Sequence, residues 1–414
     1  MRKKIGFKLV LVIAVVLSFI PGEIWAASSS VHPSNQWSRQ SVYKSPKQPI
    51  IKWAVDLGQD TGNMVIDSNN TIYAVGQYNF ATKLTAVSPD GKIKWSVQLE
   101  GETNDLALYN DNTIVLSIFD AKNGSIIAAY STDGELIWEN KYADATSAFQ
   151  PIALSSNGTI VATTRKQTND WQEEEARVIA LSVTGEQLFD ISTTWKHKYL
   201  KVSSPIIVKD HIYFTVAQGT YRQLSKSGAG TVDYFNGGKL IKMDLNGKIK
   251  WSAAYKAEYN EVSPVYTNNL IYVQSQGALF MFSPEGALKK TITDEKGYNF
   301  SYSPSFSENG TFIFGHRLYN SAGKLLWSFN PQDDLKSKKY IQNTVLIDRD
   351  QNALYTYRLY DDGIKSGVTS VNLKTKKTNW SLPLYQHMSS PPVLGSDGTL
   401  YVGGDRKLFA ISEK

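Results

Sequence analysis

The sequence offers few residues for metal or nucleophilic chemistry. It contains no cysteine, which excludes disulfides, thiolate metal sites, a cysteine nucleophile and a lipidated N-terminal cysteine. The histidines do not form a pair at metal-ligand spacing, and no His-Glu-x-x-His motif is present. They are His32, His197, His211, His316 and His387.

Other catalytic and binding motifs are also missing. There is no Gly-x-Ser-x-Gly elbow and no phosphate-binding loop. The Asp-rich segments that begin at Asp67 and Asp348 lack the glycine and final glutamate of a calcium loop, so they are predicted to be hairpin turns. We therefore predict no catalytic residue and no metal ligand. A carboxylate pair assembled from distant segments stays open as an alternative.

The N-terminus has the pattern of an export signal. Four basic residues lie within residues 1–8, a twelve-residue apolar run follows at 9–20, and small residues surround Ala26. The apolar run is shorter than the roughly 20 residues that a membrane span needs. We expect a signal peptide at 1–26, a secreted or extracytoplasmic product, and no integral membrane segment after cleavage.

The basic charge of the chain largely belongs to that signal. Removing residues 1–26 lowers the formal charge from +6 to +3. The densest remaining basic cluster is Lys336, Lys338 and Lys339, which is short for a nucleic-acid footprint. We expect no nucleic-acid partner.

A repeat organises the rest of the chain. A turn followed by a strand with tryptophan recurs, as in Ser88–Trp95, Ser131–Trp138, Asp244–Trp251 and Asn320–Trp327. Weaker copies end at Phe189, Lys290 and Trp380, whereas Trp53 has no turn before it. The intervals between these positions run from 37 to 62 residues. Self-similarity at about 40 residues is typical of propeller blades or solenoid turns.

A second recurring element lies between these positions. It is a tight turn before an alternating apolar stretch, as in Asn157-Gly-Thr-Ile, Asn309-Gly-Thr-Phe and Asp397-Gly-Thr-Leu. Such turns between alternating strands indicate hairpins. Each repeat is therefore predicted to contain four short antiparallel strands, A to D, with the tryptophan on strand D. The pattern favours an all-β propeller over a helical solenoid, and a large β-sandwich is the alternative.

The two ends of the repeat region complement each other. After Trp380 the chain supplies strands A, B and C of a last unit, and residues 50–55 form a lone strand D. The N-terminal strand is therefore expected to complete the last blade, which removes a free edge. The result is a single propeller domain of eight blades at 50–414, preceded by a polar lead-in at 27–49.

The turn-plus-tryptophan strand resembles the tryptophan-docking repeat of the pyrroloquinoline quinone (PQQ)-like β-propellers, whose pattern is Ala-x-Asp-x-x-Thr-Gly-x-x-x-Trp. The segment from Asn372 to Trp380 is the best copy, with Asn for Asp and Lys376 in place of Gly. The resemblance covers roughly residues 36–414. It implies that the repeat tryptophans are structural and stack between neighbouring blades.

The resemblance does not carry the family's enzymatic residues onto this chain. Quinoprotein dehydrogenases of the family use a catalytic Asp, a calcium site and commonly a disulfide beside the quinone. The disulfide is impossible here, and no residue matches the other positions by motif. We therefore predict no cofactor; PQQ and Ca²⁺ are not supported by any residue match. The absence of a lipidated cysteine likewise counts against the role of the family's outer-membrane assembly lipoproteins.

Strand direction predicts where binding takes place. The B–C loops and D–A connections share one face of a propeller, and all the length variation lies in the B–C loops of blades three, four and seven. Long loops on a rigid scaffold commonly bind ligands. With the connections beside them they carry the aromatic and Arg side chains favoured at recognition sites, although many of these aromatics could instead anchor the loops. The candidates are Trp171, Trp195, Tyr221, Arg222, Tyr234, Phe235, Arg358 and Tyr360.

The sequence is therefore interpreted as an exported, non-catalytic β-propeller. It would bind a protein or a cell-envelope polymer through its loop-rich face, as a monomer. The alternative is an enzyme, either a divergent quinoprotein or one that degrades an extracellular polymer.

Overall fold

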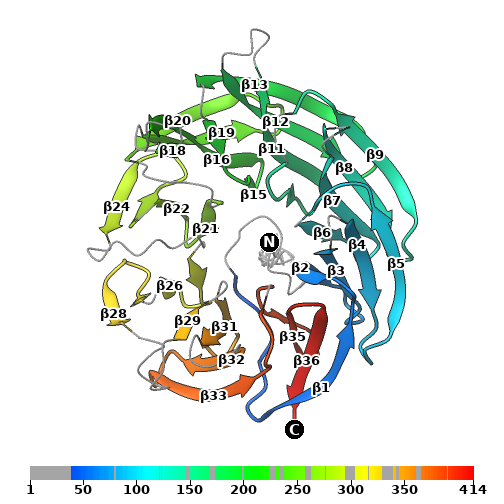
Figure 1. Ribbon diagram of the computed structural model, residues 1–414. Helices are drawn as coiled ribbons and strands as arrows, with labels where there is room; N and C mark the ends of the chain where they lie inside the picture. The colour runs from blue at the N-terminus through cyan, green and yellow to red at the C-terminus, as the bar shows by residue number, and fades with distance from the viewer. Residues whose placement is uncertain are drawn as a thin grey trace, which may run out of the picture.

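The protein is a ring of eight four-stranded antiparallel sheets arranged as the blades of a propeller (Figure 1). This computed structural model describes residues 39–414 except 79–80, 104, 121, 123, 146–148, 168–172, 198–199, 224–229, 234–236, 257–262, 276, 294–303, 316, 329–338, 342–344, 360–364 and 389. Within these ranges the regular structure is entirely β, and no helix is long and apolar enough to cross a membrane. The predicted all-β, eight-bladed architecture is confirmed.

The first four blades follow the chain in the order A, B, C, D from the axis outward. Blade 1 contains β2 (Asp60–Ile66), β3 (Ile72–Tyr78), β4 (Ala81–Val87) and β5 (Ile93–Leu99). Blade 2 contains β6 (Leu106–Tyr109), β7 (Thr113–Asp120), β8 (Gly124–Ser131) and β9 (Leu136–Tyr142). Blade 3 contains β10 (Ala153–Leu154), β11 (Thr159–Gln167), β12 (Glu174–Ser182) and β13 (Gln187–His197). Blade 4 contains β14 (Leu200–Val202), β15 (Ile206–Val208), β16 (His211–Gln218), β19 (Gly238–Asp244) and β20 (Ile249–Tyr255), with a separate ribbon of β17 (Thr220–Gln223) and β18 (Gly230–Asp233).

The remaining blades repeat this order. Blade 5 contains β21 (Val265–Thr267), β22 (Leu270–Ser275), β23 (Ala278–Phe282) and β24 (Leu288–Thr293). Blade 6 contains β25 (Ser305–Phe306), β26 (Phe312–Phe314), β27 (Arg317–Tyr319) and β28 (Leu325–Ser328). Blade 7 contains β29 (Lys339–Ile341), β30 (Leu346–Ile347), β31 (Asn352–Leu359), β32 (Lys365–Asn372) and β33 (Lys377–Pro383). Blade 8 contains β34 (Val393–Leu394), β35 (Leu400–Gly403), β36 (Lys407–Glu413) and β1 (Pro49–Asp56).

Blade 8 joins the two ends of the described chain. Strand β1 pairs antiparallel with β36 from Pro49↔Glu413 to Asp56↔Lys407. This is the pairing expected if the first strand completes the last blade. It couples residues more than 350 positions apart, so the ring is tied through backbone hydrogen bonds as well as through packing between blades.

The repeat tryptophan and the turn glycine form one unit across each blade boundary. The Trp138 indole donates from Nε1 to Val183 O of the next blade at 2.9 Å. A Cβ built on Gly185, in the same turn, would approach the Trp138 ring to 2.7 Å, and Gly185 has φ +86°. Only glycine therefore fits this position without displacing the indole. The same ring-over-glycine contact joins Trp53 to Gly91, Trp95 to Gly134 and Trp251 to Gly286, and the indoles of Trp53 and Trp95 also donate to the next turn.

Lysine replaces tryptophan at one of these positions. Lys290 of blade 5 donates from Nζ to Ala322 O at 2.7 Å and to Gly323 O at 3.0 Å in the turn of blade 6. The ammonium therefore bonds to the same part of the next blade as the indole N–H does elsewhere. This explains how a weak copy of the repeat still connects two blades.

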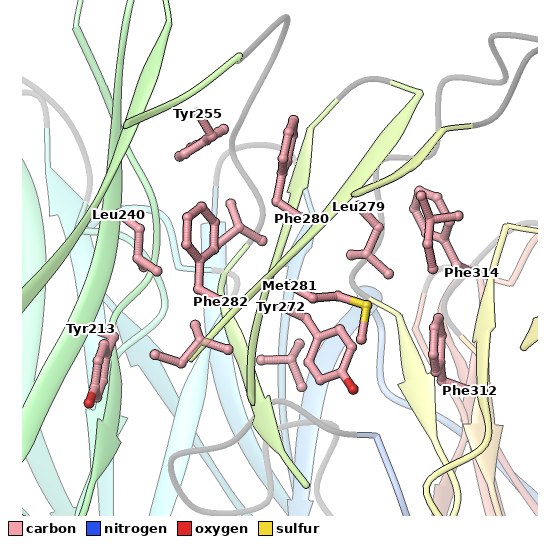
Figure 2. Close-up of a cluster of buried hydrophobic side chains, with 14 of the residues drawn as sticks. Tyr213, Leu240, Tyr255, Tyr272, Leu279, Phe280, Met281, Phe282, Phe312 and Phe314 are labelled. Atoms are coloured by element: carbon pink, nitrogen blue, oxygen red, sulfur yellow. The ribbon is translucent and has the colours of Figure 1, made fainter. Parts of the chain in front are cut away.

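The core lies between blades, since strands B and C are buried on both sides while strand D is half exposed. Figure 2 shows the cluster that joins blades 4, 5 and 6. Tyr272 of blade 5 lies 4.7 Å from Phe306 and 5.6 Å from Phe312 of blade 6, measured between ring centroids. Tilted and edge-on aromatic contacts of this kind add to the free energy of burial.

The segment before β1 supplies the turn that Trp53 lacks in the sequence. Trp380 Nε1 donates to Pro46 O at 2.8 Å, and the corresponding bond from Trp53 to Pro89 O is 2.9 Å long. Pro46 therefore takes the place of a C–D turn in blade 8. The described part of the predicted polar lead-in is thus docked on the propeller.

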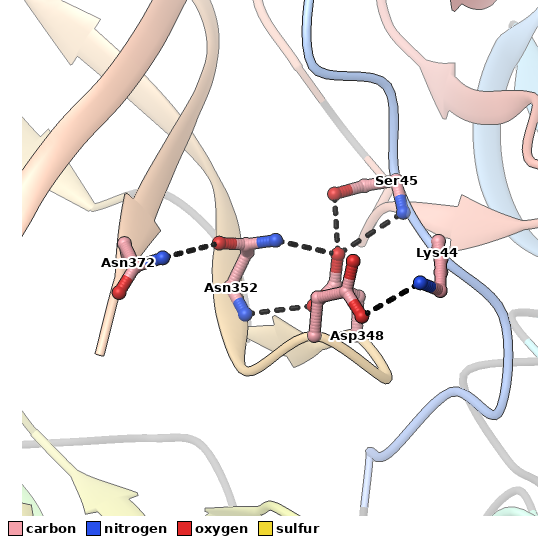
Figure 3. A network of polar contacts seen from close by, with 6 residues as sticks. Lys44, Ser45, Asp348, Asn352 and Asn372 are labelled. Carbon is pink, nitrogen blue, oxygen red and sulfur yellow. Dashed lines mark hydrogen bonds and ion pairs between the residues drawn. The ribbon is translucent and has the colours of Figure 1, made fainter. Parts of the chain in front are cut away.

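Asp348 fixes this segment to blade 7 (Figure 3). Its carboxylate is 2% exposed and accepts hydrogen bonds from Ser45 N at 3.0 Å and Ser45 Oγ at 2.5 Å. Asn352 donates to the same carboxylate from its backbone N at 2.7 Å and from Nδ2 at 2.9 Å. Lys44 pairs with Asp350 beside it at 3.2 Å.

Replacing Asp348 by alanine is expected to lower the free energy of unfolding by about 2 kcal/mol, because buried donors lose a charged acceptor. Equilibrium denaturation in urea measures this loss, and limited proteolysis should show earlier cleavage near Ser45. Asp350→Ala removes a carboxylate whose partner Lys44 is largely exposed, so it serves as the matched control with a cost below about 1 kcal/mol. Equal losses for the two variants would contradict the anchoring role of Asp348.

Candidate functional site

The two faces of the ring differ in their connections. The A–B and C–D turns lie on one face, here called the tight-turn face. The B–C loops and D–A connections lie on the other, the loop-rich face. The long B–C connections are those between β11 and β12, between β16 and β19, and between β31 and β32. Their positions in blades 3, 4 and 7 are as the sequence predicted.

The predicted site residues are distributed over three blades of the loop-rich face. Tyr221 and Arg222 lie on β17, where they pair with Val232 and Thr231 of β18. Arg358 lies on β31 between Tyr340 and Ser366 of its neighbouring strands, and Trp195 lies on β13. For these four residues only the backbone position is described. The other four candidates lie outside the described residues: Trp171, Tyr234, Phe235 and Tyr360.

A network of charged side chains lies near the loop-rich end of blade 3. Arg177 on β12 is 6% exposed and donates to both carboxylate oxygens of Asp190, from Nε at 2.8 Å and from Nη2 at 2.6 Å. Its Nη1 donates to Asp144 at 2.6 Å, and Asp144 also pairs with Lys166 at 2.9 Å. The guanidinium stands 5.1 Å from the ring centroid of Tyr142 in blade 2. This network connects blades 2 and 3.

The electrostatics of the network are those of a structural ion cluster. Burial lowers the pKa of Arg177, but its hydrogen bonds to Asp190 and Asp144 outweigh that effect and raise it. Burial raises the pKa of Asp144, but the bonds from Lys166 and Arg177 lower it overall. Both groups are therefore held in their charged forms, whereas a general acid or base needs a pKa near the working pH. Their role is to hold the long strands of blade 3.

A buried aspartate joins three blades near the axis. Asp105 is 3% exposed, accepts from Ile152 N of blade 3 at 3.1 Å and lies 3.4 Å from Asn63 Nδ2 of blade 1. Serines at the starts of inner strands also accept hydrogen bonds from backbone N–H groups. Ser203 Oγ accepts from Thr215 N at 2.9 Å, and Ser390 Oγ accepts from Gly403 N at 2.6 Å. These two serines hold backbone within their own blades.

Blades 8 and 1 hold buried amide groups at the loop-rich face. Gln59 is 1% exposed, and its Nε2 donates to Lys83 O at 3.2 Å while its Oε1 has no hydrogen-bond partner among the described residues. Nε2 of Gln77 and Oε1 of Gln386 likewise have no partner in that part of the chain. Such atoms cost about 1–3 kcal/mol each when left unpaired, so they are candidates for contact with water or a ligand.

The backbone neighbours of these residues meet across the boundary between the two blades. Gly404 of blade 8 accepts from Thr61 N of blade 1 at 3.4 Å, and a Cβ built on Gly404 would lie 3.6 Å from Gln386 Oε1. A Cβ on Gly76 would lie 3.0 Å from Gln59 Cγ. We call Gln59, Gln77 and Gln386 the amide cluster.

Two further groups lie next to Gln386. Tyr385 has a positive φ of 55° and a side chain that is 67% exposed, which is unusual for an aromatic residue. His387 Nδ1 stands 3.4 Å from Asp405 Oδ1. An exposed aromatic ring beside amide groups can stack on a flat ligand face while the amides donate and accept hydrogen bonds. The His–Asp pair can accept or hold a proton.

The described residues do not supply a metal site. No three histidine, aspartate or glutamate side chains in the described ranges lie close enough together to hold an ion. The buried carboxylate nearest the axis, Asp105, is already engaged with Ile152 N. The described part of the chain therefore does not assemble the calcium site that the family's quinoprotein dehydrogenases use, and we derive no step through such a group.

The amide cluster was missed by the sequence-based prediction. Its members are single glutamines in three short connections or strands; Gln59 and Gln77 are 18 residues apart, and Gln386 follows more than 300 residues later. The only local signal is the pair of adjacent Gln386 and His387 after a strand D. Loop length directed attention to blades 3, 4 and 7 instead.

Comparison with known proteins supports the propeller assignment. Residues 36–220 match the family model described as "Outer membrane protein assembly factor BamB". This confirms the resemblance to the PQQ-like repeat that the turn-plus-tryptophan strand indicated. No curated protein sequence matches this chain.

Solved structures with the same architecture are distant in sequence. A europium-containing methanol dehydrogenase shares 13% identity at a TM-score of 0.51, with 91% of this chain and 98% of that chain covered. The quinohemoprotein alcohol dehydrogenase from Comamonas testosteroni shares 10% identity at a TM-score of 0.57, with 94% and 81% covered. At this level of identity the likeness is one of fold alone.

Proposed function

Because this chain is a β-propeller built of PQQ-like repeats, we propose that it is an exported, non-catalytic binding protein that holds a polar cell-envelope polymer on its loop-rich face. The amide cluster of blades 8 and 1 carries the proposal. Gln59 and Gln386 each present an acceptor, and Gln77 presents a donor, without a partner among the described residues. A ligand with many hydroxyl or amide groups would satisfy all three.

The exposed Tyr385 ring supports a polymer of this kind. Sugar and peptide units present flat apolar faces, and an aromatic side chain can stack on them at small entropic cost. The ionic network of blade 3 and the Asp105 junction keep the blades rigid around this face. A rigid scaffold under short polar connections lowers the ordering cost of binding.

The proposal includes no cofactor and no metal.

The signal-like segment at 1–26 supports export. The fraction of the protein found outside the cytoplasm measures export directly. Appearance of the protein only in the cytoplasm would exclude an envelope ligand.

Binding should depend on Gln386 and Tyr385. We expect Gln386→Ala and Tyr385→Ala each to weaken binding to purified cell-wall polymer about tenfold, as for loss of a desolvated hydrogen bond or a stacked ring. Isothermal titration of the purified chain measures the dissociation constant. Gln187→Ala, the same change at an exposed position on the tight-turn face, is the matched control.

A loop deletion tests the residues that the sequence singled out. Replacing residues 218–237 by a short turn removes Tyr221, Arg222, Tyr234 and Phe235 together. Unchanged binding by this variant, with weakened binding by Gln386→Ala, would place the contact on blades 8 and 1 alone. Recovery of an envelope protein in place of a polymer, lost on the same substitutions, would favour a protein partner, as the assembly-factor description of the family would suggest.

The His387–Asp405 pair favours one further candidate, an enzyme that cleaves the polymer. The imidazole lies next to the amide cluster and is held by a carboxylate, which is the arrangement of a general base. Release of reducing ends or amines from the polymer would reveal cleavage, and His387→Ala should abolish it. A titration with PQQ and calcium tests the quinoprotein alternative, because a bound cofactor would raise the melting temperature.

A further inference from the structure

The outer strands of four blades lack a lysine that the other four carry: blades 2, 3, 6 and 7 have Ile137, Leu188, Leu326 and Asn379 in its place. Strand D of each blade is an edge; among the described residues β9 pairs only with β8, and β28 pairs only with β27. An exposed edge presents unpaired backbone groups to other chains, and proteins commonly block it with lysine. The residue before the tryptophan position is such a lysine in blades 8, 1, 4 and 5: Lys52, Lys94, Lys250 and Lys289.

In β9 and β28 aliphatic side chains replace that lysine. Leu136 and Ile137 begin β9 and are 50% and 52% exposed. Leu325 and Leu326 begin β28 and are 47% and 40% exposed. Both strands therefore present two adjacent, exposed aliphatic residues directly before the tryptophan, in the sequences Leu-Ile-Trp and Leu-Leu-Trp.

The charges around these two edges are opposite. The turns and strand starts at 131–137 and 182–188, in blades 2 and 3, contain Asp133, Glu135 and Glu186 and no lysine or arginine. The corresponding segments of blades 5, 6 and 7, at 283–290, 320–326 and 372–378, contain six lysines and one acid, Glu285. The basic segments adjoin one another, because Lys290 bonds to Ala322 O and Gly323 O, and Lys376 bonds to Leu326 O.

Blades 2 and 6 are four blades apart, so β9 and β28 lie on opposite sides of the ring (Figure 1). We propose that β9 of one copy docks against β28 of a second copy, edge to edge. The aliphatic pairs then cover each other while the acidic and basic turns meet. Because the two surfaces differ and lie on opposite sides, every assembly keeps one free β9 edge and one free β28 edge at its ends, and the contact builds open chains of rings.

Two substitutions that block one edge each test the contact. Ile137→Lys places on β9 the lysine that blades 1, 4, 5 and 8 carry at this position, and Leu326→Lys does the same on β28. Sedimentation velocity of the wild-type chain should show assemblies that grow with concentration. Each variant alone should sediment as a monomer at concentrations where the wild type assembles. The blocked edge should raise the dissociation constant of self-association at least about tenfold.

Mixing the variants gives the decisive measurement. Ile137→Lys retains β28 and Leu326→Lys retains β9, so an equimolar mixture should form dimers and nothing larger. Ile51→Lys adds a lysine beside an exposed aliphatic of blade 8 and should leave the wild-type assembly unchanged. Circular dichroism and melting temperature confirm that each variant is folded.

Three results would overturn the proposal. They are a wild-type chain that stays monomeric up to its solubility limit, variants that assemble as the wild type does, and a mixture that stays monomeric.

Vesicles of phosphatidylglycerol test the other occupant of the basic edge. A monomeric chain that pellets with these vesicles, and fails to do so as Leu326→Glu, would assign β28 to an anionic membrane surface instead.

Discussion

Replacing Arg177 by methionine is expected to lower the free energy of unfolding by about 3 kcal/mol, because it removes the buried cation of an ion cluster and leaves Asp190 without its guanidinium partner. Asp190 loses both of its bonds to the guanidinium, at 2.8 and 2.6 Å, and Asp144 loses one at 2.6 Å. The loss also removes the cation that stands over Tyr142. Equilibrium unfolding in guanidinium chloride measures the change.

The control for Arg177→Met lies on the neighbouring strand. Arg165 pairs with Glu174 at 3.1 Å, but a third of its side chain is exposed. Arg165→Met should cost less than about 1 kcal/mol. Arg177→Lys should fall between the two, since an ammonium keeps the charge but not the paired bonds to Asp190. Identical unfolding midpoints for Arg177→Met and Arg165→Met would contradict the structural role of the network.

Replacing Trp138 by alanine is expected to cost about 3 kcal/mol, because it opens a gap at the boundary of blades 2 and 3. The indole fills the space above Gly185 and donates to Val183 O at 2.9 Å. It also packs against the buried cluster that includes Ile127 and Leu181. Urea denaturation with far-UV circular dichroism measures the loss.

Two variants separate the parts of the Trp138 contact. Trp138→Phe keeps most of the ring but removes the N–H donor, so it should cost about 1 kcal/mol. Leu188→Ala shortens a half-exposed side chain on the next outer strand and should change the free energy of unfolding by less than about 0.5 kcal/mol. A loss for Trp138→Ala no greater than that for Leu188→Ala would remove the tryptophan from the set of blade-docking residues.

The fold was largely predictable from the sequence because its signals are local. The glycine of each C–D turn and the tryptophan a few residues later lie within one hairpin, and the alternation of apolar residues has the period of a strand. Four units contain both the glycine and the tryptophan, and four weaker ones lack one or the other; together they give the number of blades. Trp53 was the exception. Its turn is replaced by Ser45 and Pro46, which contact Asp348 and Trp380 from the far end of the chain.

The candidate site was predictable only in part. Loop length directed the prediction to B–C loops on the loop-rich face, where the structure places Tyr221 and Arg222 on β17 and Arg358 on β31. It did not identify Gln59 and Gln386, because a single buried glutamine has no spacing rule that distinguishes it from a surface one.

By itself, then, the sequence determined the class of the fold, the number of blades, the structural role of the tryptophans and the absence of cysteine chemistry. These follow from contacts between residues close in the chain and from composition. Only the tertiary structure decided which residues meet at the boundary of blades 8 and 1, where positions 59–77 lie beside 386–405. It also decided that β9 and β28, whose aliphatic pairs have opposite charge around them, lie across the ring from each other. Both depend on closing a ring, which brings together residues that no local pattern relates.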